Sequence, residues 1–188
     1  MASNLQNGGT RRGNRWSMAI WGTAALLLLI PLVAMQFTTE VSWTGSDFVV
    51  MGALLAIACG SYGVATRLSD SPYYRAGAGV AVLTGFVTIW VNLAVGMLGG
   101  EDNPANLLFG VVLLVGVVGA LIACFRPRGM ARAIVATGLA QAVMAVYALV
   151  AGHSEVVLLI GLFVIPWLVS AQLLQTAARK QLPLGAAT

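Results

Sequence analysis

Charged residues are scarce in this sequence. Asp, Glu, Lys and Arg together make up 9% of its 188 residues, whereas hydrophobic residues make up 59%. A soluble globular domain has roughly 25% charged residues. The shortage excludes an ordinary soluble domain and predicts that lipid surrounds most of the chain.

Charges are absent from long stretches, and these stretches define the expected helices. The uncharged segments are 16–39, 48–66, 76–100, 103–125, 133–154 and 156–178. Each is close to the roughly 20 residues that a helix needs to cross a 30 Å hydrocarbon layer. We therefore expect an all-α membrane protein, a bundle of six transmembrane helices. The expected spans are about 17–38, 47–67, 74–98, 104–125, 131–151 and 155–177.

These spans form a single membrane domain, residues 16–178, between two tails. Residues 1–15 are polar and rich in Gly and Asn, so we expect a disordered cytoplasmic tail. Residues 179–188 form a second cytoplasmic tail. No small-x-small cleavage site follows the first apolar segment, which we interpret as a retained helix rather than a signal peptide.

Basic residues are missing from one side of this arrangement. If the N-terminus is cytoplasmic, all ten Lys and Arg residues fall on the cytoplasmic side, where short loops retain them. We therefore expect both termini in the cytoplasm. The opposite side carries Glu40, Asp47, Glu101, Asp102 and Glu155. The basic residues are spread over four short segments, so they indicate topology rather than a nucleic-acid partner. The short loops are typical of a bacterial inner-membrane protein.

The residues of metal and catalytic sites are also rare. There are two cysteines, Cys59 and Cys124, expected at different depths, so no disulfide framework is indicated. The single histidine, His153, lies near Glu155, and the chain has no HExxH or GxSxG motif. One interpretation of the outer face is a metal site formed by Glu101, Asp102, Asn103, His153 and Glu155, but a solvated surface is favoured. The sequence predicts no metal, no cofactor and no enzymatic activity.

No charged residue lies near the middle of an expected span, which argues against a proton pump or a voltage sensor. The polar residues that remain are neutral. Asn92 and Asn106 are expected at similar depth on two adjacent spans, near an outer loop with acids, and Gln141 lies mid-span. One interpretation is an outward-facing polar pocket made by Asn92, Glu101, Asp102, Asn103, Asn106 and Gln141. The other, which is favoured, is that these amides tie helices together and cap helix ends.

Several local patterns predict helix ends and helix contacts. Thr44 with Asp47 is a capping box, and Ser71–Pro72, Asn103–Pro104 and Ser154 are expected to start helices. Prolines at 31 and 166 are expected to kink the first and last spans. Small residues recur four apart, which favours close helix packing in a compact bundle. They are Gly52, Ala56 and Gly60; Gly77, Ala81 and Gly85; and Gly116 and Ala120.

The segment 126–132 is the densest basic loop. Arg126, Arg128 and Arg132 have two interpretations: topology signals with general attraction to anionic lipid headgroups, or a specific phosphate or lipid site. The first is favoured on the sequence alone.

Two hypotheses for function follow. The first is a non-enzymatic accessory or assembly protein, or an oligomeric bundle, whose partners are the lipid bilayer and either further copies of itself or another membrane protein. The alternative is a small permease or channel for a neutral solute, with its pocket at Asn92, Asn106 and Gln141.

Overall fold

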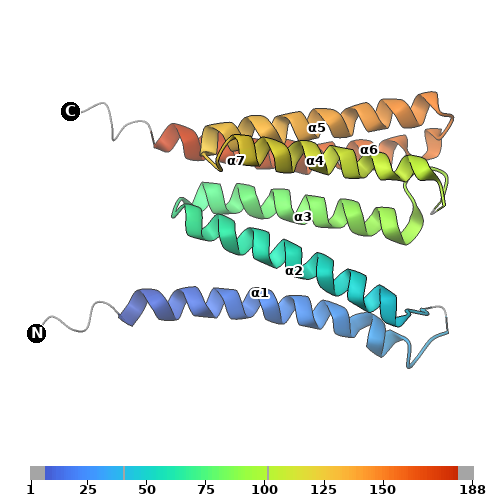
Figure 1. The fold of residues 1–188 in the computed structure, drawn as a ribbon, viewed down its shortest axis with the longest axis horizontal. Coiled ribbons are helices and arrows are strands. Elements are labelled where there is room, and N and C mark those ends of the chain that lie inside the picture. Colours follow the sequence, from blue (N-terminus) through green and yellow to red (C-terminus); the bar gives the residue numbers. More distant parts are fainter. Residues whose placement is uncertain (1–6, 40, 101, 182–188) are drawn as a thin grey trace, which may run out of the picture. The chain divides into compact units, whose positions relative to one another are not determined.

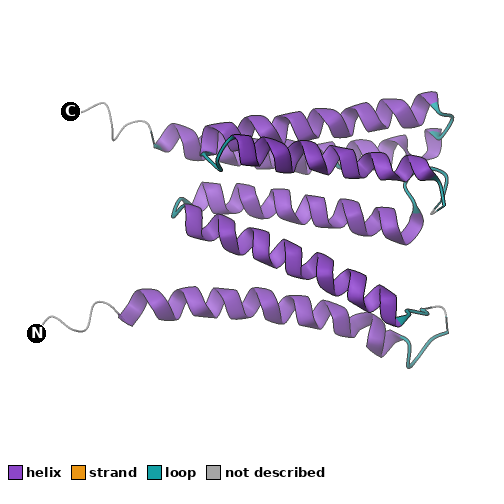
Figure 2. Cartoon of the chain, in the orientation of Figure 1, coloured by secondary structure: helices purple, strands orange, loops and turns teal. Residues whose placement is uncertain are grey.

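The computed structural model describes residues 7–39, 41–100 and 102–181, although side chains are described only from Met18 onward. Every regular element in this part of the chain is a helix (Figure 2). Five helices are long and apolar enough to cross a membrane, and a shorter apolar one covers Met18–Ala34. This is the architecture of a multi-pass helical membrane protein, as the sequence predicts.

The helices follow one another in the order drawn in Figure 1. They are α1 (Asn7–Ala34), α2 (Gly45–Leu68), α3 (Pro72–Val95), η1 (Pro104–Leu107), α4 (Leu108–Ile122), α5 (Pro127–Val150), η2 (Ser154–Val156), α6 (Val157–Leu162) and α7 (Val164–Lys180). The short 3₁₀ helices η1 and η2 lead into α4 and α6. The chain divides into two compact units, 1–63 and 64–188, with the boundary inside α2.

The first unit is a hairpin of α1 and most of α2. Helix α1 begins at Asn7, inside the segment where the sequence predicts a disordered tail. Adding a residue to an existing helix costs far less than nucleating one, so an apolar helix can extend into a polar flank. The capping box is confirmed: the Asp47 carboxylate accepts from the Thr44 N–H at 2.7 Å, and the Thr44 hydroxyl accepts from the Asp47 N–H at 3.4 Å.

The second unit is a bundle in which α5 packs against α4, α6 and α7, while α3 packs against α7. Its buried apolar side chains form two clusters. One contains Tyr74, Met130, Ile134 and Leu174. The other contains Met97, Leu98, Phe109, Met144 and Ile160.

Glycines let these helices approach closely, as the small-residue pattern predicts for α3 and α4. A Cβ added at Gly77 would lie 2.9 Å from the side chain of Leu174 on α7. One at Gly116 would lie 2.8 Å from the Thr137 hydroxyl on α5. Such contacts supply the van der Waals packing that holds helices together in lipid.

The last span is broken where the sequence predicts a kink. Helix α6 ends at Leu162 and α7 starts at Val164, so the break precedes Pro166. Proline has no N–H and its ring collides with the carbonyl four residues earlier, here that of Leu162. Pro31, in contrast, lies inside the uninterrupted α1.

Some helix ends differ from the predicted spans. Helix α3 stops at Val95 rather than 98, and α4 stops at Ile122 rather than 125. Helix α5 begins at Pro127, because proline fits a first helical position and polar arginines can belong to a first turn. The predicted cap at Ser154 is wrong: this residue is the first of η2, and His153 precedes it without a capping bond from its side chain.

Candidate functional site

Two asparagines hold the loop between α3 and η1. The Asn92 amide nitrogen donates to the carbonyl of Asn106 at 2.9 Å, and its oxygen accepts from the Met97 N–H at 3.3 Å. The Asn106 oxygen accepts from the Leu98 N–H at 2.9 Å, and its nitrogen donates to the Gly100 carbonyl at 2.7 Å. We call Asn92 and Asn106 the asparagine clasp. Their expected proximity across the hairpin is confirmed.

The clasp is needed because this loop folds inward. Met97 and Leu98 are 1% and 0% exposed, so their N–H groups have no access to water. Buried backbone donors must find acceptors, and an asparagine side chain offers both an acceptor and donors. Glycines at 96, 99 and 100 adopt positive φ, which makes the inward turn sterically accessible.

The other residues described around the clasp from the predicted polar pocket do not take part in the clasp. Asn103 accepts from the Ala105 N–H at 2.9 Å and caps η1, so its expected capping role is confirmed. Asp102 is exposed. Glu101 lies outside the described residues. The clasp therefore uses its amides on the loop backbone, which favours the structural interpretation of these residues.

Gln141 serves a different part of the bundle. It is fully buried on α5 and donates to the carbonyl of Ile160 at 3.3 Å. Ile160 lies in the last turn of α6, where carbonyls lack a partner within the helix. The Gln141 side-chain oxygen and the buried Trp167 indole N–H have no hydrogen-bond partner among the described residues.

The loop between α3 and η1 meets the loop before η2 at one further point. A Cβ added at Gly99 would lie 2.8 Å from His153 Cε1, so the two loops are in close contact. His153 Nδ1 lies 3.6 Å from a Glu155 carboxylate oxygen. Within the described ranges, no group of three or more His, Cys, Asp or Glu side chains is placed to hold a metal ion.

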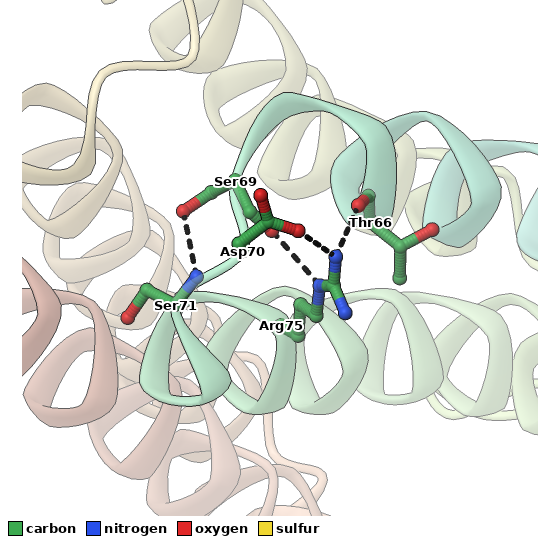
Figure 3. Close-up of polar contacts among 5 residues, drawn as sticks. All are labelled: Thr66, Ser69, Asp70, Ser71 and Arg75. Carbon is green, nitrogen blue, oxygen red and sulfur yellow. Dashed lines mark hydrogen bonds and ion pairs between the residues drawn. The ribbon is translucent and has the colours of Figure 1, made fainter. Parts of the chain in front are cut away.

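The opposite end of the second unit contains a site that the sequence did not reveal. Arg75, on α3, forms hydrogen bonds with the end of α2 (Figure 3). Its Nε donates to the Ser69 carbonyl at 2.9 Å, and its Nη2 donates to the Thr66 carbonyl at 3.0 Å. Nη2 also contacts the Asp70 carboxylate at 2.7 Å. In the sequence Arg75 is interpreted only as a topology signal. In the structure it also caps the last turn of a helix.

Near this end, the α4–α5 turn borders a cavity of about 440 Å³. Arg126 and Arg128 line it, whereas Arg132, one turn further along α5, is not part of its wall. The remaining lining residues are Ala123, Pro127, Gly129, Ala178 and Gln181. The structure thus separates the three arginines that the sequence groups together.

The chain was compared with protein-family models, with curated proteins and with solved structures, and it matches none of them.

Proposed function

We propose that this chain is a non-enzymatic membrane protein that works by helix association, either as an accessory or assembly subunit or as a homo-oligomer. We place both ends of the chain in the cytoplasm of a bacterial cell and its spans in the inner membrane. The distribution of Lys and Arg supports this orientation, because the start of α3, the α4–α5 turn and the end of α7 all carry basic residues.

The observation that carries the proposal is the small-residue stripe on α2. In the equivalent stripes of α3 and α4, a Cβ added at Gly77 or Gly116 would lie 2.9 or 2.8 Å from a neighbouring helix. On α2, Ala56 and Gly60 are exposed, and a Cβ at Gly60 would meet nothing within 4 Å. Stripes of this kind are typical of helix interfaces in membranes. Within the first unit the stripe on α2 is therefore uncovered, and we propose that a helix from another chain packs on it.

The sparse core of the first unit also supports association. In its described part, Ala24, Pro31 and Leu55 are the buried residues, while most other side chains of α1 and α2 are exposed or half-buried. A hairpin with so few packed side chains gains stability when a further helix packs on it. The permease alternative has less support, because the side-chain amides of the asparagine clasp form hydrogen bonds with backbone groups rather than lining a pocket.

The test is the native mass of the protein purified in mild detergent from its own membrane, with identification of any partner. Ala56→Leu and Gly60→Leu block close approach at the stripe, so we expect each to release the partner or reduce the oligomer to single chains. Ala58→Leu is the matched control, since it lies about 200° around the helix from Ala56. A wild-type protein that purifies alone as a single chain contradicts the proposal.

A further inference from the structure

Small residues and two arginines line the cavity beside the α4–α5 turn. Ala123 and Gly129 bring the end of α4 against the start of α5, so closely that a Cβ on Gly129 would lie 2.5 Å from the Ala123 Cβ. Ala178, in α7, and Gln181, just after it, line the cavity on another side. Its volume of about 440 Å³ is within the range of small-ligand sites, about 300 to 1,000 Å³.

The positive charge at this cavity is not neutralised by the described part of the chain. The side chains of Arg126 and Arg128 are exposed, and no described residue forms an ion pair or hydrogen bond with either. Asp70, an acid of the same end of the unit, is paired with Arg75. Arg126 and Arg128 therefore keep their guanidinium donors for a ligand.

We propose that this cavity binds a phosphate group. Guanidinium groups bind phosphate through two parallel hydrogen bonds, which gives them both strength and geometric selectivity. Arg126 is the N-cap of α5 and Pro127 its first residue, so the first N–H groups of this helix adjoin the cavity, where they favour an anion. The side-chain amide of Gln181 adds a neutral donor.

The place of the cavity in the bundle suggests two sources for the phosphate. The cavity lies where apolar helices end, the depth at which phospholipid headgroups lie. An anionic phospholipid supplies a phosphodiester from within the bilayer, and a soluble phosphate reaches the same arginines from the water. Arg132, outside the lining, is expected to contribute only general surface attraction.

The first arm of the test uses the full chain in bilayer discs of phosphatidylcholine containing one fifth phosphatidylglycerol. Native mass spectrometry then counts the phosphatidylglycerol that remains bound. We expect the double variant Arg126→Gln/Arg128→Gln to retain at most about one tenth of the wild-type amount of phosphatidylglycerol. The reason is that each charge-assisted hydrogen bond raises the affinity tenfold or more. Arg132→Gln removes one charge from the same end of α5 and should retain the wild-type amount.

The second arm uses discs of phosphatidylcholine alone, with inorganic phosphate added and its binding measured by calorimetry. Saturable binding that the double variant loses identifies a soluble phosphate as the source. Retention of phosphatidylglycerol with no such binding identifies the lipid. A variant with lysine at both positions keeps the charge but not the paired donors, so it should bind less than wild type and more than the double glutamine variant.

Three results overturn the proposal. One is equal retention of phosphatidylglycerol by the wild type and the double variant, with no phosphate binding. Another is an equal loss in Arg132→Gln, which would mean that the loop attracts anions without a site. The third is no binding of either probe by the wild type. Both faces of a disc are open to solvent, so a change of membrane orientation in the arginine variants cannot mimic any of them.

Discussion

Asn106 uses both ends of its side-chain amide on the loop between α3 and η1. Its oxygen accepts from Leu98, which is fully buried, and its nitrogen donates to Gly100. Asn92 is only half-buried; its oxygen accepts from the Met97 N–H at a longer 3.3 Å, and its nitrogen donates to the Asn106 carbonyl at 2.9 Å. At the level of single residues, Asn106 should therefore be the more costly of the two to replace.

We expect Asn106→Ala to lower the free energy of unfolding by roughly 2 to 4 kcal/mol, since it leaves a buried donor and a carbonyl without partners. Asn92→Ala should cost about 1 to 2 kcal/mol, because the half-buried Asn92 loses a longer bond from the Met97 N–H and one bond to the Asn106 carbonyl. Equilibrium unfolding in mixed micelles measures both. Wild-type stability in Asn106→Ala together with a loss of solute uptake would instead support the pocket of the permease hypothesis.

Arg75 and Asp70 form a second pair of residues with unequal expected effects. The Asp70 side chain is fully exposed, and exposed ion pairs contribute little. The carbonyls of Thr66 and Ser69, in contrast, accept from Arg75 at the end of α2.

We expect Arg75→Gln to lower the free energy of unfolding by about 1 to 3 kcal/mol, because these carbonyls lose a charged donor. Asp70→Asn should change it by less than about 0.5 kcal/mol. The same micelle unfolding assay compares the two variants. Equal losses would show that the ion pair, and not the capping of α2, stabilises this turn.

The end of helix α4 is a Schellman motif without its usual glycine. The Phe125 N–H donates to the Ala120 carbonyl at 3.1 Å and the Cys124 N–H to the Leu121 carbonyl at 2.9 Å. Cys124 has φ of 46°, in the left-handed region that glycine adopts without cost. The Tyr74 hydroxyl on α3 donates to the Phe125 carbonyl at 2.9 Å and holds this turn in place.

We expect Cys124→Gly to raise the free energy of unfolding by up to about 1 kcal/mol, because it relieves the left-handed strain at this helix end. Cys59→Gly, within α2, is the contrasting variant and should be destabilising by roughly 0.3 kcal/mol or more. Thermal unfolding in detergent ranks the variants. A loss of stability in Cys124→Gly would mean that contacts of the thiol outweigh the backbone strain.

The helices themselves were predictable from uncharged length, but several of their ends were not. The capping residues Thr44, Ser71 and Asn103 act locally, so their sequence patterns suffice. The end of α4 was missed because Cys124 and Phe125 are ordinary apolar residues that tertiary contacts hold in a left-handed turn. The end of α3 was missed because Met97 and Leu98 are as apolar as a span, yet they belong to an inward-folded loop.

At the scale of the whole molecule, membrane orientation can be tested with a cysteine that the chain already has. Cys124 is exposed at the α4–α5 turn, on the end that we place in the cytoplasm, while Cys59 lies within α2. In a Cys59→Ser background, we expect a membrane-impermeant maleimide to label Cys124 in inverted vesicles and not in intact spheroplasts. Gly152→Cys in a cysteine-free background should show the reverse. Labelling of Cys124 in spheroplasts would contradict the proposed orientation.

Of the candidate sites, one could be predicted from the sequence and the other could not. Helical geometry alone brought Asn92 and Asn106 to the same depth, and the structure confirms their contact. The cavity at Arg126 and Arg128 was not predictable, since it depends on the end of α7 meeting a turn some fifty residues earlier in the chain. Contacts of that range are set by packing between helices, which no local pattern records.

Trp167, close to the break between α6 and α7, is a fluorescent probe of the bundle interior. Trp167 is 4% exposed and its indole N–H has no partner among the described residues, whereas Trp21 and Trp90 are about half exposed. An excited indole in a dry, apolar site emits at shorter wavelength. Where water or other polar groups can reorient around the excited indole, its emission moves to longer wavelength. Light emitted by Trp167 should therefore move to longer wavelength whenever the helix break opens to water.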